Sequence, residues 1–344
     1  MTTFIQLHLL TSYPPANLNR DDSGQPKTAT MGGALRARVS SQSLKRAWRT
    51  SEVFAEPLAG HVGTRTKRFA ENPMNRMVAA GKDEKEARKT ASEIAGAIAK
   101  VDKDAAPFTG QLVHLSPNEI AAIDALSERL AAGERVDPAK EPLLGGAEGA
   151  ADIAMFGRML ADRPEHSVEA AVQVAHAITT HRVTVEDDYF TAVDDLKPRG
   201  EDAGAGHVGE QEFVAGVFYL YLCIDRDLLM SNLGGDESLG RTARRALAEA
   251  AVRVGPRGKQ ASFASRAYAS YALAERGSRQ PRGLSVAFLK PMTGDDLLKK
   301  SIDSLETTCA DMDKVYGACA DDRYAFDVSS GKGTLAGLLD FVGG

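Results

Sequence analysis

The longest apolar run of this chain, Phe213–Ile224, spans twelve residues and holds no charged side chain. A membrane-spanning helix needs about 20 consecutive apolar residues, so the run is too short to cross a bilayer. Its length and its many β-branched and aromatic residues are typical of a strand that is covered on both faces. We therefore expect a core built around a buried central strand.

Shorter segments with strand character lie on both sides of this run. Residues 2–13 alternate in polarity and favour a strand, which Pro14-Pro15 ends. Residues 36–39 and 284–288 predict two more short strands, with helices between the strands. This order predicts an α+β fold whose sheet is interrupted by insertions. A ferredoxin-like sheet fits the order, but so do other α+β sheets.

The sequence between the first strands and the buried strand reads as mostly helical over residues 56–181. Asp83–Val101 is rich in alanine and charge, and Pro117–Ala132 begins with proline and has apolar residues at helical spacing. Ala151–Leu160 and Val168–His181 are expected to be two further helices. We interpret the block as a helical insertion into the sheet domain.

Residues 182–212 change character. They alternate Val and Thr, then carry acidic turns and several glycines, which is typical of a β-hairpin arm that projects from the body. Helices are expected over Leu239–Val254 and Thr334–Val342. The sheet domain would then consist of residues 1–55 and 213–344.

Charge is distributed unevenly along the chain. The whole sequence has a formal net charge of −5, which by itself argues against nucleic-acid binding. Residues 20–49 nevertheless carry a net charge of +5, because two acidic residues are outnumbered by seven basic ones, Arg20, Lys27, Arg36, Arg38, Lys45, Arg46 and Arg49. A basic segment on an acidic body can bind a polyanion locally.

The start of one predicted helix lies inside this basic segment. Ser40-Ser41 caps a helix that runs to about Phe54. The free N–H groups and positive dipole end of such a helix favour phosphate. Polar side chains share one face of the helix at i, i+3, i+4 and i+7, namely Gln42, Lys45, Arg46 and Arg49. The pattern predicts a phosphate cradle, although an ordinary capped helix with a solvated basic face has the same pattern.

The cysteines and the first residues of the chain indicate the cellular compartment of the protein. Cys223, Cys309 and Cys319 form no C-x-x-C pair, so we expect reduced thiols and no zinc site. The first residues lack the basic region of a signal peptide, and Gln6 and His8 interrupt their apolar run. We expect a cytoplasmic protein that has no membrane partner.

Enzymatic motifs are missing from the sequence. It holds no Walker motif, G-x-S-x-G or H-E-x-x-H. His176 and His181 and the acidic residues near 187–195 invite comparison with a metal nuclease. Histidines at i and i+5 point to different sides of a helix, however, whereas helical metal pairs need i, i+3 or i, i+4. We expect no catalytic residue, no metal and no cofactor.

Several separate motifs occur in order along the chain. They are L-N-R-D-D at 18–22, S-S-Q-S-L-K-R-A at 40–47, D-I-A at 152–154, G-R-M at 157–159, H-A-I-T-T-H at 176–181, F-T-A-V-D-D-L at 190–196, G-x-Q-E-F at 209–213, G-V-F-Y at 216–219 and G-K-Q at 258–260. In this order they resemble the CasC family, the backbone subunit of the type I-E CRISPR Cascade complex.

The resemblance implies a right-hand shape. An RRM-like, ferredoxin-like palm would carry a helical fingers insertion and a β-hairpin thumb. Family members are non-catalytic and self-associate along the CRISPR RNA, which pairs with target DNA while other Cascade subunits complete the complex. Base pairing then reads the sequence, and the protein holds the backbone.

The resemblance also implies which residues contact RNA. Guide phosphates and riboses would be held by residues of the basic segment, the G-R-M and G-K-Q motifs would contribute, and the thumb would flank a displaced nucleotide. The implied residues are Arg20, Lys27, Ser40, Gln42, Lys45, Arg46, Arg49, Arg158, Met159, Tyr189, Phe190, Val208, Lys259 and Gln260.

Other interpretations stay open at this point. Met159 could belong to a core, Tyr189 and Phe190 could anchor the hairpin, and Lys259 could be a solvated loop charge. The chain could also be a stand-alone RRM-like RNA-binding protein or a CRISPR-associated endoribonuclease. The second alternative would need a catalytic His or Tyr beside a glycine-rich loop, and Gly331-Lys332-Gly333 lacks such surroundings.

Overall fold

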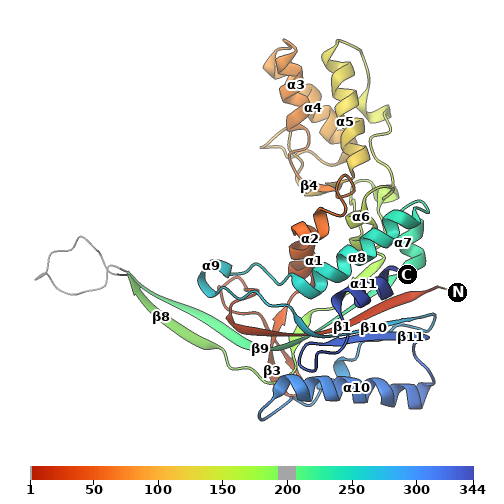
Figure 1. The fold of residues 1–344 in the computed structure, drawn as a ribbon. Helices are drawn as coiled ribbons and strands as arrows, with labels where there is room; N and C mark the ends of the chain where they lie inside the picture. The colour runs from red at the N-terminus through yellow and green to blue at the C-terminus, as the bar shows by residue number, and fades with distance from the viewer. Residues whose placement is uncertain (1, 193–206) are drawn as a thin grey trace, which may run out of the picture.

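The structure is a computed structural model that describes residues 2–192 and 207–344 (Figure 1). Over these residues one antiparallel sheet has the order β11-β10-β1-β9-β7-β3-β2, and β6 and β8 pair with β9 outside this path. Its strands are β1 (Phe4–Ala16), β2 (Thr28–Met31), β3 (Ala34–Val39), β6 (Val172–Val174), β7 (Ala177–Thr179), β8 (Glu186–Ala192), β9 (His207–Asp225), β10 (Ala269–Gly277) and β11 (Asp322–Asp327). The α+β class is therefore confirmed.

Helices cover the sheet and build the insertion. They are α1 (Ser41–Arg49), α2 (Glu52–Ala55), α3 (Glu71–Ala79), α4 (Glu84–Ile98), α5 (Pro117–Ala131), α6 (Ala151–Phe156), α7 (Arg226–Asn232), α8 (Glu237–Arg253), α9 (Gln260–Phe263), α10 (Leu297–Tyr316) and α11 (Leu335–Gly343). Among the described residues, no helix is long and apolar enough to span a membrane.

The central strand expected from the apolar run is confirmed. β9 is antiparallel to β1 on one side, with Leu222 opposite Leu7, and pairs with β6, β7 and β8 in turn on the other side. Leu222 and Ile224 are completely buried. Side chains of β9 enter the core on each face of the sheet, Leu220 and Leu222 on one and Val217 and Tyr219 on the other, which explains why the sequence is apolar without interruption.

The two faces of the sheet carry different layers. Leu7 and Leu9 of β1 belong to one core with Trp48 of α1 and Leu247 of α8. Leu10 belongs to a second core, together with residues of α10. Side chains alternate between the faces of a strand, so β1 supplies both cores. Figure 1 shows α8 and α11 on one side of the sheet and α10 on the other.

The insertion has a core of its own. Helices α3, α4 and α5 pack around a separate cluster of buried residues and extend away from the sheet (Figure 1). A small ribbon of β4 (Thr64–Thr66) and β5 (Val113–Leu115) lies at its base. The predicted helices over 83–101 and 117–132 are confirmed.

The predicted helix over 168–181 is wrong. These residues form β6 and β7, which pair with β9, so they belong to the sheet and not to the helical insertion. The segment has both helical spacing and β-branched residues. Without β6 and β7, backbone N–H and C=O groups along one edge of β9 would lack partners. Pairing with this edge therefore favours the strand conformation over the helix.

Other boundaries also differ from the sequence-based expectations. Residues 285–288 form a 3₁₀ turn rather than a strand, and β10, β11 and α10 were not predicted. β1 continues through Pro14-Pro15 to Ala16, and the first helix ends at Arg49, where Ser51 caps α2 separately. The expected helices near 239–254 and 334–342 are confirmed.

The arm is a β-hairpin of β8 and the first part of β9, as expected. Tyr189 lies opposite Glu210, and Phe190 lies opposite Gly209. The hairpin projects far from the sheet (Figure 1). The expected glycine-rich turns at 193–206 lie outside the described residues.

Candidate nucleic-acid interface

The N-terminus of α1 is fixed by two side-chain caps. The Ser40 hydroxyl accepts a hydrogen bond from the Ser43 N–H at 3.3 Å, and Asn19 Oδ1 accepts one from the Ser40 N–H at 2.8 Å. Ser40 is buried and acts as the cap, while Gln42 in the first turn is exposed. Of the two, Gln42 is the side chain that an external phosphate can reach.

An open hollow of about 790 Å³ lies beside this helix. Three guanidinium-bearing residues from separate segments line it, Arg20 from the loop after β1, Arg46 from α1 and Arg257 from the loop after α8. Asp21 and Asp22 also line it. The hollow, called the arginine hollow below, can hold an anion between converging cations.

Backbone contacts hold the three walls of the arginine hollow together. A Cβ at Gly258 would collide with the Leu18 carbonyl oxygen, so this residue must be glycine for the loop to approach the first wall. Arg257 Nη2 donates to the Thr50 carbonyl at 2.9 Å and ties the same loop to the end of α1. The cations are therefore brought together by tertiary contacts and not by sequence spacing.

Two predicted cations of α1 are partly engaged inside the protein. Arg49 Nη1 lies 3.2 Å from Asp152 Oδ2 and donates to the Gly63 carbonyl at 3.2 Å. The Lys45 ammonium lies 5.8 Å from the centre of the Phe156 ring, and burial lowers the pKa of Lys45. Arg46 is thus the exposed cation of this face. Arg49 forms a structural ion pair, and its predicted contact with phosphate stays a prediction.

The G-R-M motif divides into an internal residue and an external one. The Arg158 side chain is 1% exposed and donates to Glu119 at 2.7 Å and to the Gly145 carbonyl at 2.8 Å. Its guanidinium is not accessible to RNA, so the predicted contact is revised. Met159 is 83% exposed, and the alternative that it belongs to the core is wrong.

The predicted residues of the arm lie on two faces. Tyr189 and Val208 are 62% and 50% exposed and share one face, because Val208 lies opposite Thr191 and side chains alternate along a strand. Phe190 occupies the other face, where its ring covers Gly209. Tyr189 and Val208 therefore expose apolar side chains on the same face of the arm.

The loop after α8 connects to the base of the arm. Lys259 Nζ donates to Gln211 Oε1 at 3.1 Å, and Gln211 Nε2 donates to Asp188 Oδ2 at 2.7 Å. Gln260 turns inward and donates to the Pro256 carbonyl at 2.9 Å. The predicted roles of Lys259 and Gln260 in RNA binding stay predictions, since both side chains already hold the loop.

A second basic cluster lies around Lys27. Arg38 Nη1 donates to His176 Nδ1 at 2.9 Å, and Lys27 lies opposite Arg38 across the β2–β3 edge. Burial, and then the charges of Arg38 and Lys27, lower the pKa of His176. The neutral ring therefore presents its Nε2–H as a donor.

Sequence reasoning missed Arg257 and the Arg38–His176 pair. Arg257 directly precedes the G-K-Q motif, and Arg38 was counted only as a charge. No local signal distinguishes these residues from ordinary surface cations. Arg257 lines the hollow with Arg20 and Arg46, which come from distant segments of the chain. Arg38 likewise bonds to His176, which lies far away in the sequence.

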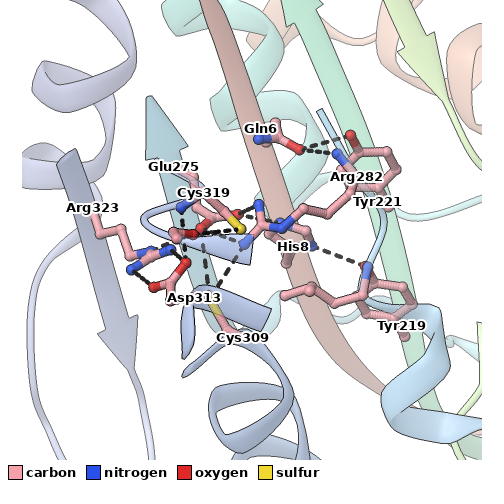
Figure 2. A network of polar contacts seen from close by, with 12 residues as sticks. Gln6, His8, Tyr219, Tyr221, Glu275, Arg282, Cys309, Asp313, Cys319 and Arg323 are labelled. Atoms are coloured by element: carbon pink, nitrogen blue, oxygen red, sulfur yellow. Dashed lines mark hydrogen bonds and ion pairs between the residues drawn. The ribbon is translucent and has the colours of Figure 1, made fainter. Parts of the chain in front are cut away.

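A buried polar network lies under the opposite face of the sheet (Figure 2). His8 Nε2 lies 3.1 Å from Glu275 Oε2, and the Tyr219 hydroxyl lies 2.9 Å from His8 Nδ1. Arg282 and Arg323 each bond to Glu275, at 2.6 and 2.8 Å.

The network explains the polar residues inside the first strand. Gln6 and His8 face α10 and are satisfied there, while their neighbours face the other core. His8 and Glu275 have no exposed surface, so no substrate can reach them. Among the described residues, no group of His, Cys, Asp and Glu could hold a metal ion.

Comparisons with known proteins agree with one another. A family model described as CT1975-like protein matches residues 5–337. A chain from a structure described as "CRISPR RNA-guided surveillance complex, pre-nicking" is 30% identical, with a TM-score of 0.86 and 99% of both chains covered. A second, from a "CRISPR RNA-guided surveillance complex", is 25% identical, with a TM-score of 0.72 over 98% of this chain and 99% of the other. No curated protein matches the chain.

Proposed function

This chain belongs to the CT1975-like protein family, and from that premise we propose that it is a guide-RNA-binding backbone subunit of a CRISPR surveillance complex. The proposal places the chain in the type I-E Cascade complex as a CasC subunit. Copies would associate along one CRISPR RNA and leave its bases free to pair with target DNA, and other Cascade subunits would complete the complex.

The observation that carries the RNA-binding role is the arginine hollow. Arg20, Arg46 and Arg257 line it together with Asp21 and Asp22, and none of the three arginines forms an ion pair among the described residues. A guanidinium group can bind a phosphate in a bidentate manner, with two parallel N–H···O hydrogen bonds. Three of them on a protein of net negative charge favour a local polyanion site over general electrostatic attraction.

Exposed apolar residues support the proposed contacts with the bases of the RNA. Met159 is exposed and would wedge against a base, since its flexible thioether adapts to irregular surfaces. Tyr189 and Val208 would flank a displaced nucleotide by stacking and apolar contact. The sheet would serve as an RRM-like palm, the α3–α5 block as fingers and the β8–β9 hairpin as thumb.

The subunit is proposed to be non-catalytic. The buried His8–Glu275 pair is out of reach of a substrate. Beside the G-K-G turn at 331–333, the Tyr324 hydroxyl accepts a hydrogen bond from the Thr334 N–H at 2.8 Å, so this tyrosine has a structural role. RNA bound by this chain should therefore stay intact.

Binding of repeat–spacer RNA by the purified chain tests the proposal. Light scattering across salt concentrations should find multimers whose mass grows with RNA length and which dissociate as salt rises. The RNA should be recovered at full length. A chain that remains monomeric on RNA favours a stand-alone RNA-binding protein, and cleaved RNA favours an endoribonuclease.

A further inference from the structure

The arginine hollow contains two carboxylates, Asp21 and Asp22, that a simple phosphate site would exclude. Asp22 lines it together with Arg20, Arg46 and Arg257. We propose that the hollow distinguishes RNA from DNA, with the Asp22 carboxylate accepting a hydrogen bond from the 2′-hydroxyl of a nucleotide whose phosphate the arginines hold. The inference rests on the proposed RNA-binding function and names how that site selects its ligand.

The neighbouring carboxylate has a different, structural role. Asp21 Oδ1 accepts hydrogen bonds from the Ser23 N–H at 2.9 Å, the Ser23 hydroxyl at 2.7 Å and the Gln25 N–H at 3.0 Å. These bonds, led by that of the Ser23 hydroxyl, lower the pKa of Asp21. Asp21 therefore builds the turn that presents Asp22.

Asp22 has no such structural role. Within residues 2–192 and 207–344 it makes no hydrogen bond or ion pair, and it is exposed. The turn places it beside three guanidinium groups, yet none lies within ion-pair distance. Its carboxylate thus remains available as an acceptor for something that enters the hollow.

The negative charge of Asp22 requires that a ligand of the hollow carry a hydrogen-bond donor. A carboxylate repels a phosphate, so Asp22 weakens the binding of any anion that lacks a hydrogen-bond donor. A ligand with a donor beside its phosphate offsets the repulsion, because a hydroxyl that donates to a carboxylate forms a strong, charge-assisted bond. The ribose 2′-hydroxyl is such a donor, and deoxyribose lacks it.

The ribose is a better match than the base edges. Donors on the bases change with sequence, whereas every ribonucleotide carries the same 2′-hydroxyl. A site that must accept any guide sequence therefore gains from contacting the sugar. The walls that hold Asp22 and Arg257 are fixed by the Gly258–Leu18 approach and the Arg257–Thr50 bond, so the acceptor and the cations keep their spacing.

Binding of matched single strands tests the inference. Fluorescence anisotropy would compare RNA, DNA and 2′-O-methyl RNA of one short sequence on the wild-type chain and on Asp22→Ala. We expect the wild type to prefer RNA by about 10-fold or more, the range of one charge-assisted hydrogen bond. Asp22→Ala should lower this preference at least several-fold, by weakening RNA and leaving DNA unchanged or tighter.

Two matched variants separate the role of Asp22 from that of the turn. Asp22→Asn keeps an acceptor without its charge and should retain an intermediate preference. Asp21→Asn loosens the turn and should weaken RNA and DNA alike. An unchanged RNA-to-DNA ratio in Asp22→Ala would overturn the ribose assignment alone, whereas a wild-type chain that binds neither strand would overturn the proposed function with it.

Discussion

Arg49 Nη1 of α1 lies 3.2 Å from Asp152 Oδ2 of α6, and the Asp152 side chain is completely buried. Asp152 also accepts from the His114 ring at 2.9 Å, the Gly63 N–H at 2.8 Å and the Ile153 N–H at 3.0 Å. Gly63 and His114 belong to the base of the helical insertion. One buried carboxylate therefore joins the insertion to the helix that carries the arginine hollow.

Removal of this ion pair should destabilise the fold. In Arg49→Ala the buried Asp152 carboxylate loses its arginine partner and keeps only the His114 ring as a side-chain partner. We expect the free energy of unfolding to fall by about 2 kcal/mol. Denaturant unfolding measures the change. Arg46→Ala, on the exposed face of the same helix, should stay within about 0.5 kcal/mol of wild type. Equal stability of the two variants would contradict the structural role of Arg49.

The cations of the arginine hollow should govern the salt dependence of RNA binding. Arg20→Ala with Arg46→Ala should weaken binding to all RNA sequences and lower the slope of log affinity against log salt by about 1.4, because two fewer counterions are released. Anisotropy titrations at several salt concentrations give the slope.

A charge-matched variant serves as the control for that slope. Lys89→Ala with Lys140→Ala removes the same charge from exposed positions of the insertion. Its salt slope should equal that of the wild type. If both double variants lose the same slope, binding depends on net charge and not on the hollow.

Tyr189 and Phe190 should differ, although they are neighbours. Tyr189→Ala removes an exposed ring and should weaken RNA binding by about 1–3 kcal/mol while stability stays unchanged. Phe190→Ala uncovers Gly209 and should also make the hairpin more sensitive to limited proteolysis. Identical protease sensitivity of the two variants would show that the two faces of the arm are equivalent.

The buried network under α10 should make stability fall in acid. Burial lowers the pKa of His8 below its usual 6.5, and hydrogen bonds from His8, Arg282 and Arg323 outweigh burial and hold the pKa of Glu275 well below 4.5. As pH falls through about 6.5, His8 binds a proton in the unfolded chain but not in the folded chain. Below about 4.5 the unfolded chain does the same at Glu275. Both steps therefore reduce stability.

The substitution His8→Gln separates the first of these steps. Glutamine can still donate toward Glu275 and accept from Tyr219, but it does not titrate. Between pH 7 and 5 the unfolding midpoint of wild type should fall more steeply than that of the variant. Parallel curves would mean that other groups cause the acid sensitivity.

The positions of several elements follow from the sequence alone. The run Phe213–Ile224 predicts the central strand, because only a strand covered on both faces tolerates so many apolar residues over that length. Ser40 and the residues after it predict the start of α1, because capping is a local interaction. The Val and Thr alternation and the glycines of residues 182–212 predict the hairpin arm, whose strand β8 begins at Glu186, after the alternating residues.

Non-local contacts decided the rest. Spacing places Lys45, Arg46 and Arg49 on one helix face, yet Asp152 draws Arg49 inward from 103 positions away. Residues 168–181 have a helical pattern but meet the open edge of β9 and become strands. Periodicity cannot foresee either outcome, since both depend on which partner arrives in space.

The candidate site shows the same division between local and tertiary information. The sequence by itself determined that a basic segment and a capped helix occur together, and which family motifs accompany them. Only the tertiary structure brought Arg257 to Arg20 and Arg46, buried Arg158 beside Glu119 and left Asp22 without an ion-pair partner among the residues that the structure describes. Helix caps and strand patterns arise within a few residues, whereas burial and ion pairing depend on segments that meet only after folding.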